Sequence, residues 1–243
     1  MIIAIANQKG GVAKTATAQA IATGAAKIGR RSLAIDADPQ SNLSYSMGGN
    51  SADIGLYELM TGAATPCQII QHTPQGDIIT ASSRLALPFT GKDPGKLLAN
   101  ALRPIKSKYD VITIDCPPAL NILLANALIA ADVVIIPLTA DMYALQGLYQ
   151  LKQSITDAQK INKGLKIGGV VFTRHSTRTI LARDLTDVIT DKCRELDIPT
   201  YKTTIREAVA VREAQTQRMS LFDYAPRAKV TADYKQLIKE IGL

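Results

Sequence analysis

The sequence predicts an α/β protein in three layers, a twisted, mostly parallel sheet with helices on both faces. Five short apolar runs are nearly continuous rather than alternating, which is typical of strands covered on both faces. They are Ile2–Ala6, Ser32–Ile35, Val111–Ile114, Val133–Leu138 and Ile167–Phe172. Segments of helical composition lie between and after these runs, and strands that alternate with helices indicate a parallel sheet.

Four longer segments have the composition and spacing of helices. They are Thr15–Ile28, Asp141–Ile161, Ala182–Glu195 and Val230–Ile241. Residues 43–105 mix turn signals with short helical patterns, and we assign them to the same unit. We therefore predict a single domain over residues 1–243, a length that buries roughly 70–75% of its unfolded surface.

The composition indicates a globular protein of the cytoplasm. Hydrophobic residues make up 47% of the chain and tryptophan is absent, so the core should be aliphatic. The cysteines Cys67, Cys116 and Cys193 have no metal-ligand spacing, which predicts reduced, buried thiols. Residues 1–6 lack the basic leader of a signal peptide, and Asp132 interrupts the longest candidate membrane span.

Positive charge is concentrated in the last third of the chain. Residues 1–151 hold 11 basic and 10 acidic side chains, whereas residues 152–243 hold 17 and 11. A basic C-terminal third indicates a polyanionic partner, nucleic acid before membrane; an ordinary basic surface is the alternative.

Residues 7–15 have the features of a loop that holds phosphate. They follow an apolar strand and open an alanine-rich helix. Gly10 and Gly11 let the backbone approach an anion, and the amides and dipole at the helix start attract it. Lys14 would contact the β- and γ-phosphates, and the Thr15 hydroxyl would bind Mg²⁺.

Lys9 distinguishes this loop from the commoner G-x-x-x-x-G-K-[ST] form. The sequence instead matches the deviant form K-G-G-x-x-K-[ST]. A second lysine on the same phosphates would crowd Lys14, so Lys9 is better placed to reach a nucleotide in a partner subunit. The predicted nucleotide-binding segment is Lys9, Gly10, Gly11, Val12, Ala13, Lys14, Thr15 and Ala16.

Three aspartates follow predicted strands, at the sheet edge where parallel sheets bind ligands. Asp36 and Asp38 beside a phosphate loop indicate metal and water handling, and an acidic turn that caps a helix at Ser41 or Asn42 is the alternative. Asp115 has the position of a Walker B acid, which holds Mg²⁺ through water.

Together these motifs resemble the ParA/Soj/MinD family of P-loop ATPases, and especially its short ParA type. The resemblance runs nearly end to end. Its most specific anchors are Gln8–Thr15, Asp36–Gln40 and Tyr109–Pro118, supported by Ala131-Asp132, Ile136-Pro137, Asp141–Gly147 and Tyr224–Arg227.

The resemblance implies an ATPase that uses ATP and Mg²⁺ and dimerises with nucleotide at the interface. It implies catalytic roles for Lys9, Lys14 and Asp38, with Asp38 positioning the attacking water. It implies that Asp36 lies near Mg²⁺, so the expected metal-site residues are Thr15, Asp36 and Asp115. Thr173 and the loop around Ile205 are our candidates for contact with the base.

Two residues depart from the family pattern. Ala13 replaces the usual glycine before the lysine, and we expect it to be tolerated if its φ is negative, as at a helix start. Ala16 replaces a threonine, which removes one hydroxyl contact to the α-phosphate and weakens nucleotide binding by about 1 kcal/mol.

The resemblance further implies sequence-independent binding to double-stranded DNA. It also implies a ParB-like partner that stimulates hydrolysis, and partition of a plasmid, chromosome or mobile element on the nucleoid; positioning of a protein cargo is the alternative. The best candidates for DNA contact are Arg178, Arg206 and Arg212, within a wider set of cations, Arg174, Arg183, Arg218, Arg227 and Lys229.

Other functions of related proteins fit this sequence less well. A MinD-like membrane-positioning ATPase needs a free amphipathic C-terminal helix, and the segment 235–243 is short and equally fits packing on the sheet. An iron–sulfur carrier needs paired cysteines, and a bacterial tyrosine kinase a tyrosine-rich tail. A non-hydrolysing binding module is disfavoured because Lys14, Thr15, Asp38 and Asp115 are intact.

Overall fold

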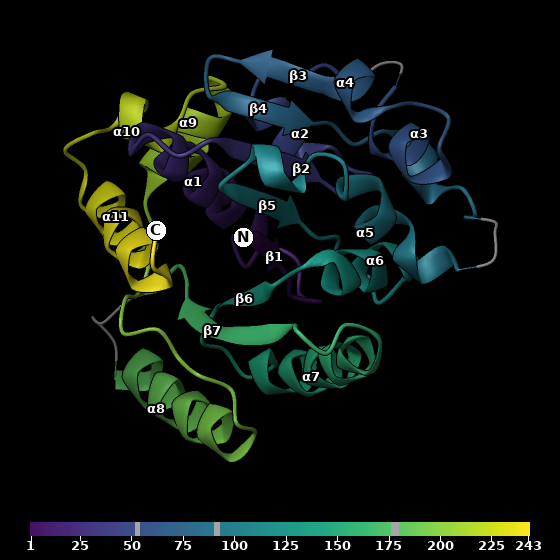
Figure 1. The fold of residues 1–243 in the computed structure, drawn as a ribbon. Helices are drawn as coiled ribbons and strands as arrows, with labels where there is room; N and C mark the ends of the chain where they lie inside the picture. Colours follow the sequence, from purple (N-terminus) through teal and green to yellow (C-terminus); the bar gives the residue numbers. More distant parts are fainter. Residues whose placement is uncertain (52–53, 90–92, 176–179) are drawn as a thin grey trace.

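A seven-stranded sheet organises the chain in a computed structural model that describes residues 1–51, 54–89, 93–175 and 180–243 (Figure 1). The strands stand in the order β3-β4-β2-β5-β1-β6-β7. All neighbours are parallel except β3 and β4. Their bounds are β1 Ile2–Ile5, β2 Ser32–Asp36, β3 Ile70–Thr73, β4 Gly76–Ile79, β5 Val111–Asp115, β6 Val133–Leu138 and β7 Lys166–Phe172. The predicted fold class is confirmed.

Helices cover both faces of this sheet (Figure 1). Their bounds are α1 Lys14–Lys27, α2 Asn42–Ser46, α3 Leu56–Thr61, α4 Pro66–Ile69, α5 Leu97–Leu102, α6 Ile122–Ala130, α7 Ala144–Ile161, α8 Ile180–Glu195, α9 Val209–Thr216, α10 Leu221–Tyr224 and α11 Lys229–Ile241. Each helix predicted from the sequence is present, and α7 begins three residues later than expected because Asp141 starts a turn.

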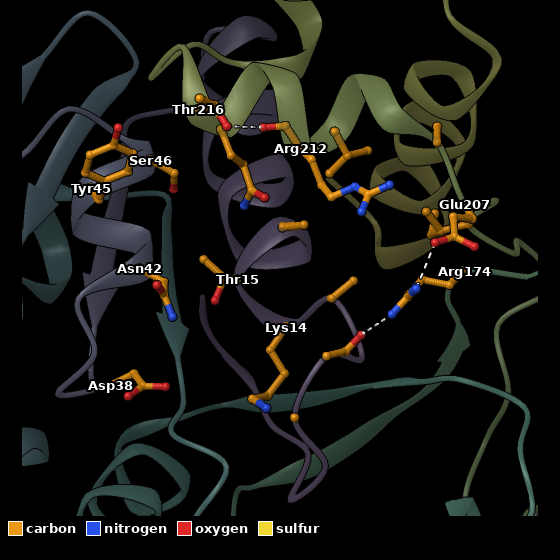
Figure 2. A pocket seen from close by; sticks show the side chains of 18 of the residues that line it. Lys14, Thr15, Asp38, Asn42, Tyr45, Ser46, Arg174, Glu207, Arg212 and Thr216 are labelled. Carbon is orange, nitrogen blue, oxygen red and sulfur yellow. Dashed lines mark hydrogen bonds and ion pairs between the residues drawn. The ribbon is translucent and has the colours of Figure 1, made fainter.

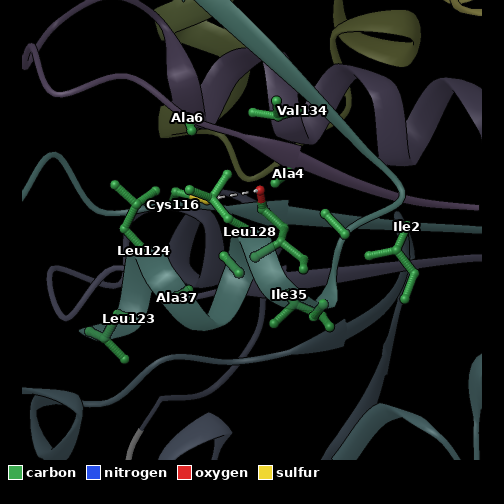
Figure 3. Close-up of a cluster of buried hydrophobic side chains, with 14 of the residues drawn as sticks. Ile2, Ala4, Ala6, Ile35, Ala37, Cys116, Leu123, Leu124, Leu128 and Val134 are labelled. Atoms are coloured by element: carbon green, nitrogen blue, oxygen red, sulfur yellow. Dashed lines mark hydrogen bonds between the residues drawn. The ribbon is translucent and has the colours of Figure 1, made fainter. Parts of the chain in front are cut away.

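Two apolar clusters lie on opposite faces of the sheet, and alternation along β1 shows how they arise. Ile2 and Ala4 belong to the cluster formed with α3, α5, α6 and α7, whereas Ile3 and Ile5 belong to the cluster formed with α1, α10 and α11. Figure 3 shows side chains from β1, β2 and α6 gathered in the first cluster. Strands buried on both faces need apolar residues at every position, which explains their continuous runs.

The C-terminal helix α11 is packed rather than free. Its apolar residues Val230, Tyr234, Leu237 and Ile238 are buried in the cluster shared with α1. An apolar face occupied in this way has no surface left to insert into a lipid interface. In the described part of the chain, no helix has the length and apolar character needed to cross a membrane.

Residues 43–105 contain structure that the sequence did not predict. The short strands β3 and β4 pair antiparallel around the turn at residues 74–75, and β4 then adds to β2. β3 (IQHT) is partly exposed at the sheet edge and is not apolar, so it lacks the signal that identified the central strands. The turn Pro74-Gln75-Gly76 was the usable clue.

Candidate functional site

The loop between β1 and α1 lies at the carboxyl edge of the central strand. β1 ends at Ile5, and α1 starts at Lys14, which is buried at the helix N-terminus. Its ammonium donates a 3.0 Å hydrogen bond to the Lys9 carbonyl. Burial lowers the pKa of Lys14, and the carboxylate of Asp115 offsets part of that effect. A side chain added at Gly10 would meet no atom within 4 Å, so the loop leaves its backbone open to a ligand.

Ala13 has a left-handed backbone. Its φ is 61° and its ψ is 30°, immediately before α1. From the sequence, Ala13 was expected to be tolerated if its φ were negative. The φ is positive, so that condition is not met. Glycine accepts this conformation without a steric penalty, while alanine brings its Cβ close to the following carbonyl oxygen. The loop thus contains strain at the residue that precedes its lysine.

Thr15 and Asp115 meet at the centre of the site. The Thr15 hydroxyl donates a 2.7 Å hydrogen bond to Oδ2 of Asp115, and Oδ1 of the same carboxylate is buried with no partner among the described residues. Burial raises the pKa of Asp115 well above its usual range, and the negative charge of the nearby Asp36 adds a smaller effect in the same direction. A buried carboxylate with an unused oxygen beside a threonine hydroxyl fits Mg²⁺, which prefers oxygen ligands.

That metal would depend on more than protein side chains. The described residues contain no group of three or more His, Cys, Asp or Glu side chains able to hold a metal ion. Mg²⁺ commonly uses one or two carboxylates together with substrate phosphates and water. Thr15 and Asp115 beside the phosphate loop match that pattern.

Asp36 and Asp38 have different environments. Asp36 is fully buried at the end of β2, and its carboxylate accepts hydrogen bonds from the amides of Asp38 and Ser44 and from the Ser44 hydroxyl. Burial raises the pKa of Asp36 to about 6. Ser44 lies in the first turn of α2, so Asp36 anchors the start of that helix, close to the alternative drawn from the sequence.

Asp38 is only partly buried and lines the main cavity (Figure 2). Its Oδ1 accepts a 3.0 Å hydrogen bond from the Gln40 amide. Asp38 therefore presents a carboxylate to the cavity, while Asp36 is turned toward protein. The predicted roles of the two residues stay predictions.

Lys9 is held away from Lys14 by an ion pair. Its ammonium contacts Asp141, which lies 132 residues further along the chain. Both side chains line a second, smaller cavity of about 250 Å³ that also borders the loop. Around the same edge of the sheet, Leu120, Met142 and Tyr143 are exposed apolar side chains, with 50%, 80% and 75% of their surfaces accessible.

The main cavity has a volume of about 730 Å³ and extends from the phosphate loop to α9. Figure 2 shows Asp38 on one side of Lys14 and Thr15, and Arg174 and Glu207 on the other. Of the two candidate base contacts, Ile205 lines this cavity. The other, Thr173, is buried and donates a 3.0 Å hydrogen bond to the carbonyl of Val12.

Part of the cavity wall was missed by the sequence analysis. Residues of α9 and the loop before it contribute Ala208, Val211, Gln215 and Thr216. They lie about 200 residues from the phosphate loop, in a segment that the sequence analysis considered only for possible DNA contacts of Arg206 and Arg212.

Two of the three preferred DNA-contact candidates also face this cavity. Arg206 makes a two-pronged ion pair with Asp233, with distances of 2.6 and 2.7 Å. Arg206 and Arg212 both line the cavity. Arg178 lies outside the described residues. None of these contacts with DNA is tested by the geometry, so they stay predictions.

Comparison with known proteins gives a consistent result. A protein family described as an AAA domain matches residues 1–167. The chain is 37% identical to the sporulation initiation inhibitor protein Soj of Bacillus subtilis, over 99% of this chain and 98% of that protein. It is 35% identical to the chromosome partitioning protein ParA of Caulobacter vibrioides, over 99% and 93%.

Solved structures agree with the fold. One similar structure is cobyrinic acid a,c-diamide synthase from Mycobacterium smegmatis with bound ADP and magnesium, with a TM-score of 0.86, 30% identity and coverage of 98% of this chain and 92% of that one. Another is a putative plasmid partition protein from Borrelia burgdorferi bound to AMPPNP, with a TM-score of 0.82, 26% identity and coverage of 99% and 97%.

Proposed function

This chain belongs to the Soj/ParA family of P-loop ATPases, and we propose that it is an ATP-driven dimerising switch that partitions DNA. As a member of that family it is an ATPase whose cofactors are ATP and Mg²⁺. In this proposal residues 1–243 act as one ATPase domain. The observation that carries the proposal is the presence of two lysines on one phosphate loop, only one of which faces the main cavity.

The residues of the site divide the work of phosphoryl transfer. Amides at the start of α1 and the ammonium of Lys14 would hold the β- and γ-phosphates. Thr15 and Asp115 would hold Mg²⁺, which neutralises charge on the phosphate oxygens. Asp38 would orient the attacking water, since its carboxylate faces the cavity.

Lys9 is the proposed link between nucleotide and dimer. In one subunit its ammonium is paired with Asp141 beside the loop, not directed at the phosphates. A partner subunit that docks on this edge would bring its Lys9 toward the nucleotide and would cover the exposed Met142 and Tyr143. The dimer would therefore be stable only while the γ-phosphate is present, because the phosphate supplies the charge that Lys9 needs.

DNA binding is proposed to use the cations of the last third of the chain. That region holds 17 basic and 11 acidic residues. Contacts to phosphates alone would be independent of sequence and sensitive to salt. A ParB-like partner would stimulate hydrolysis, and the protein would act in the cytoplasm on the nucleoid. The cargo is a plasmid, a chromosome or a mobile element.

The decisive test is binding to arbitrary duplex DNA with ATP, with ADP and without nucleotide, at two salt concentrations. Wild type should bind only with ATP, and binding should weaken steeply with salt. Lys14→Ala should abolish it. Lys106→Ala is the control, since Lys106 pairs with Asp132, away from the phosphate loop, and should leave binding unchanged. DNA binding that ignores nucleotide, or binding to liposomes instead of DNA, would refute the partition proposal.

A further inference from the structure

Three arginines line the main cavity, and their guanidinium groups are not equivalent. Arg174 donates hydrogen bonds to Glu207 (2.8 Å) and to the Gly11 carbonyl (3.3 Å). Arg206 is paired with Asp233. The guanidinium of Arg212 has no ion pair or hydrogen bond with any residue that the structure describes, although the Arg212 carbonyl accepts a bond from Thr216.

Figure 2 shows the side chain of Arg212 descending from α9 toward the side of the cavity where Arg174 and Glu207 lie. Arg212 is exposed to solvent and also lines the cavity, so its guanidinium is free to contact a ligand that occupies the cavity.

The site defines which end of the nucleotide would reach Arg212. The phosphates are fixed at Lys14 and Thr15, where the helix N-terminus, the lysine and the metal-binding hydroxyl converge. Asp38 lies on the opposite side of these residues from Arg212 (Figure 2). A carboxylate placed to handle water belongs at the γ-phosphate end, so the base and ribose must extend the other way.

The wall on that other side suits a flat aromatic ring. Ile205, Ala208 and Val211 supply an apolar surface next to Arg212. A planar guanidinium stacks on aromatic faces, and its weak hydration makes it suited to a partly buried contact. The apolar wall and Arg212 could therefore hold a purine between them.

We infer that Arg212 closes over the base and ribose end of the bound nucleotide and contributes to nucleotide selection. This inference rests on the nucleotide site of the proposed function and assigns Arg212 to nucleotide in place of DNA. Arg212 then stabilises ATP and ADP alike, because both carry the same base and ribose. It does not help to bind a bare phosphate chain.

Calorimetry with ATP, ADP and inorganic tripolyphosphate tests this assignment on Arg212→Ala, Arg212→Lys and Arg227→Ala. Arg227 is the matched control, an exposed arginine outside the cavity. Arg212→Ala should weaken ATP and ADP about tenfold each, equivalent to about 1.4 kcal/mol, and leave tripolyphosphate within about twofold. Arg212→Lys should recover only part of the loss, and Arg227→Ala should match wild type.

Two results would overturn the inference. An equal loss for tripolyphosphate would place the contact on the phosphates, and unchanged ATP affinity with weaker DNA binding would return Arg212 to the DNA surface. Wild-type protein that binds ATP but never DNA would refute partition while leaving the Arg212 measurement intact. A normal melting temperature for Arg212→Ala would show that the fold is preserved.

Discussion

Ala13 should be less favourable than glycine at its position, so Ala13→Gly should stabilise the protein. The residue has a φ of 61° and directly precedes α1. A non-glycine residue in the left-handed region costs about 1–2 kcal/mol. Glycine loses more chain entropy on folding, about 0.5–1 kcal/mol, which offsets part of the gain. The expected net stabilisation is about 1 kcal/mol.

For a chain of this length, 1 kcal/mol shifts the melting temperature by about 2–4 °C. Thermal unfolding of the nucleotide-free protein, followed by circular dichroism, measures that shift. The control is Ala232→Gly, at an exposed position inside α11, where the same substitution should destabilise by about 1 kcal/mol. If Ala13→Gly lowered the melting temperature as the control does, the strain argument would be refuted.

Three further changes test the packing and chemistry of the chain. Gly24→Ala should destabilise by about 1 kcal/mol in thermal unfolding, because overpacking of the new Cβ against Ile238 Cδ1 and the Phe222 ring outweighs the better helix propensity of alanine; unchanged stability would show that these side chains move aside. Glu58→Gln should destabilise by about 1–3 kcal/mol at pH 7. Burial alone would raise the pKa of Glu58, but hydrogen bonds, including that from Arg84, lower it, so its contribution is present above about pH 4.5 and lost as the pH falls through the lowered pKa. A melting-temperature difference from wild type that did not shrink as the pH was lowered below 4.5 would contradict this. In thiol titration of the native protein, only the exposed Cys67 should react quickly, and rapid labelling of either buried cysteine would show that the core opens.

The sequence was most informative about the central strands. All five predicted runs match a strand within one residue at each end, because strands buried on both faces carry a continuous apolar signal. The phosphate loop and Asp115 could likewise be placed, since each follows such a strand and parallel strands share one carboxyl edge. The edge strand β3 was missed because an edge strand needs little apolar character, and its neighbour β4 (GDII) was missed because only its last two residues are apolar.

The local sequence therefore determined which segments form the central strands of the sheet, and it predicted which residues hold phosphate and magnesium. Tertiary structure decided what the side chains around the site face. Lys9 faces Asp141, Asp36 faces Ser44, and Arg212 faces the main cavity. It also decided the left-handed backbone at Ala13. The physical reason is separation along the chain. A strand or a loop is specified by neighbours in sequence, whereas these contacts depend on how the sheet and its helices bring distant segments together.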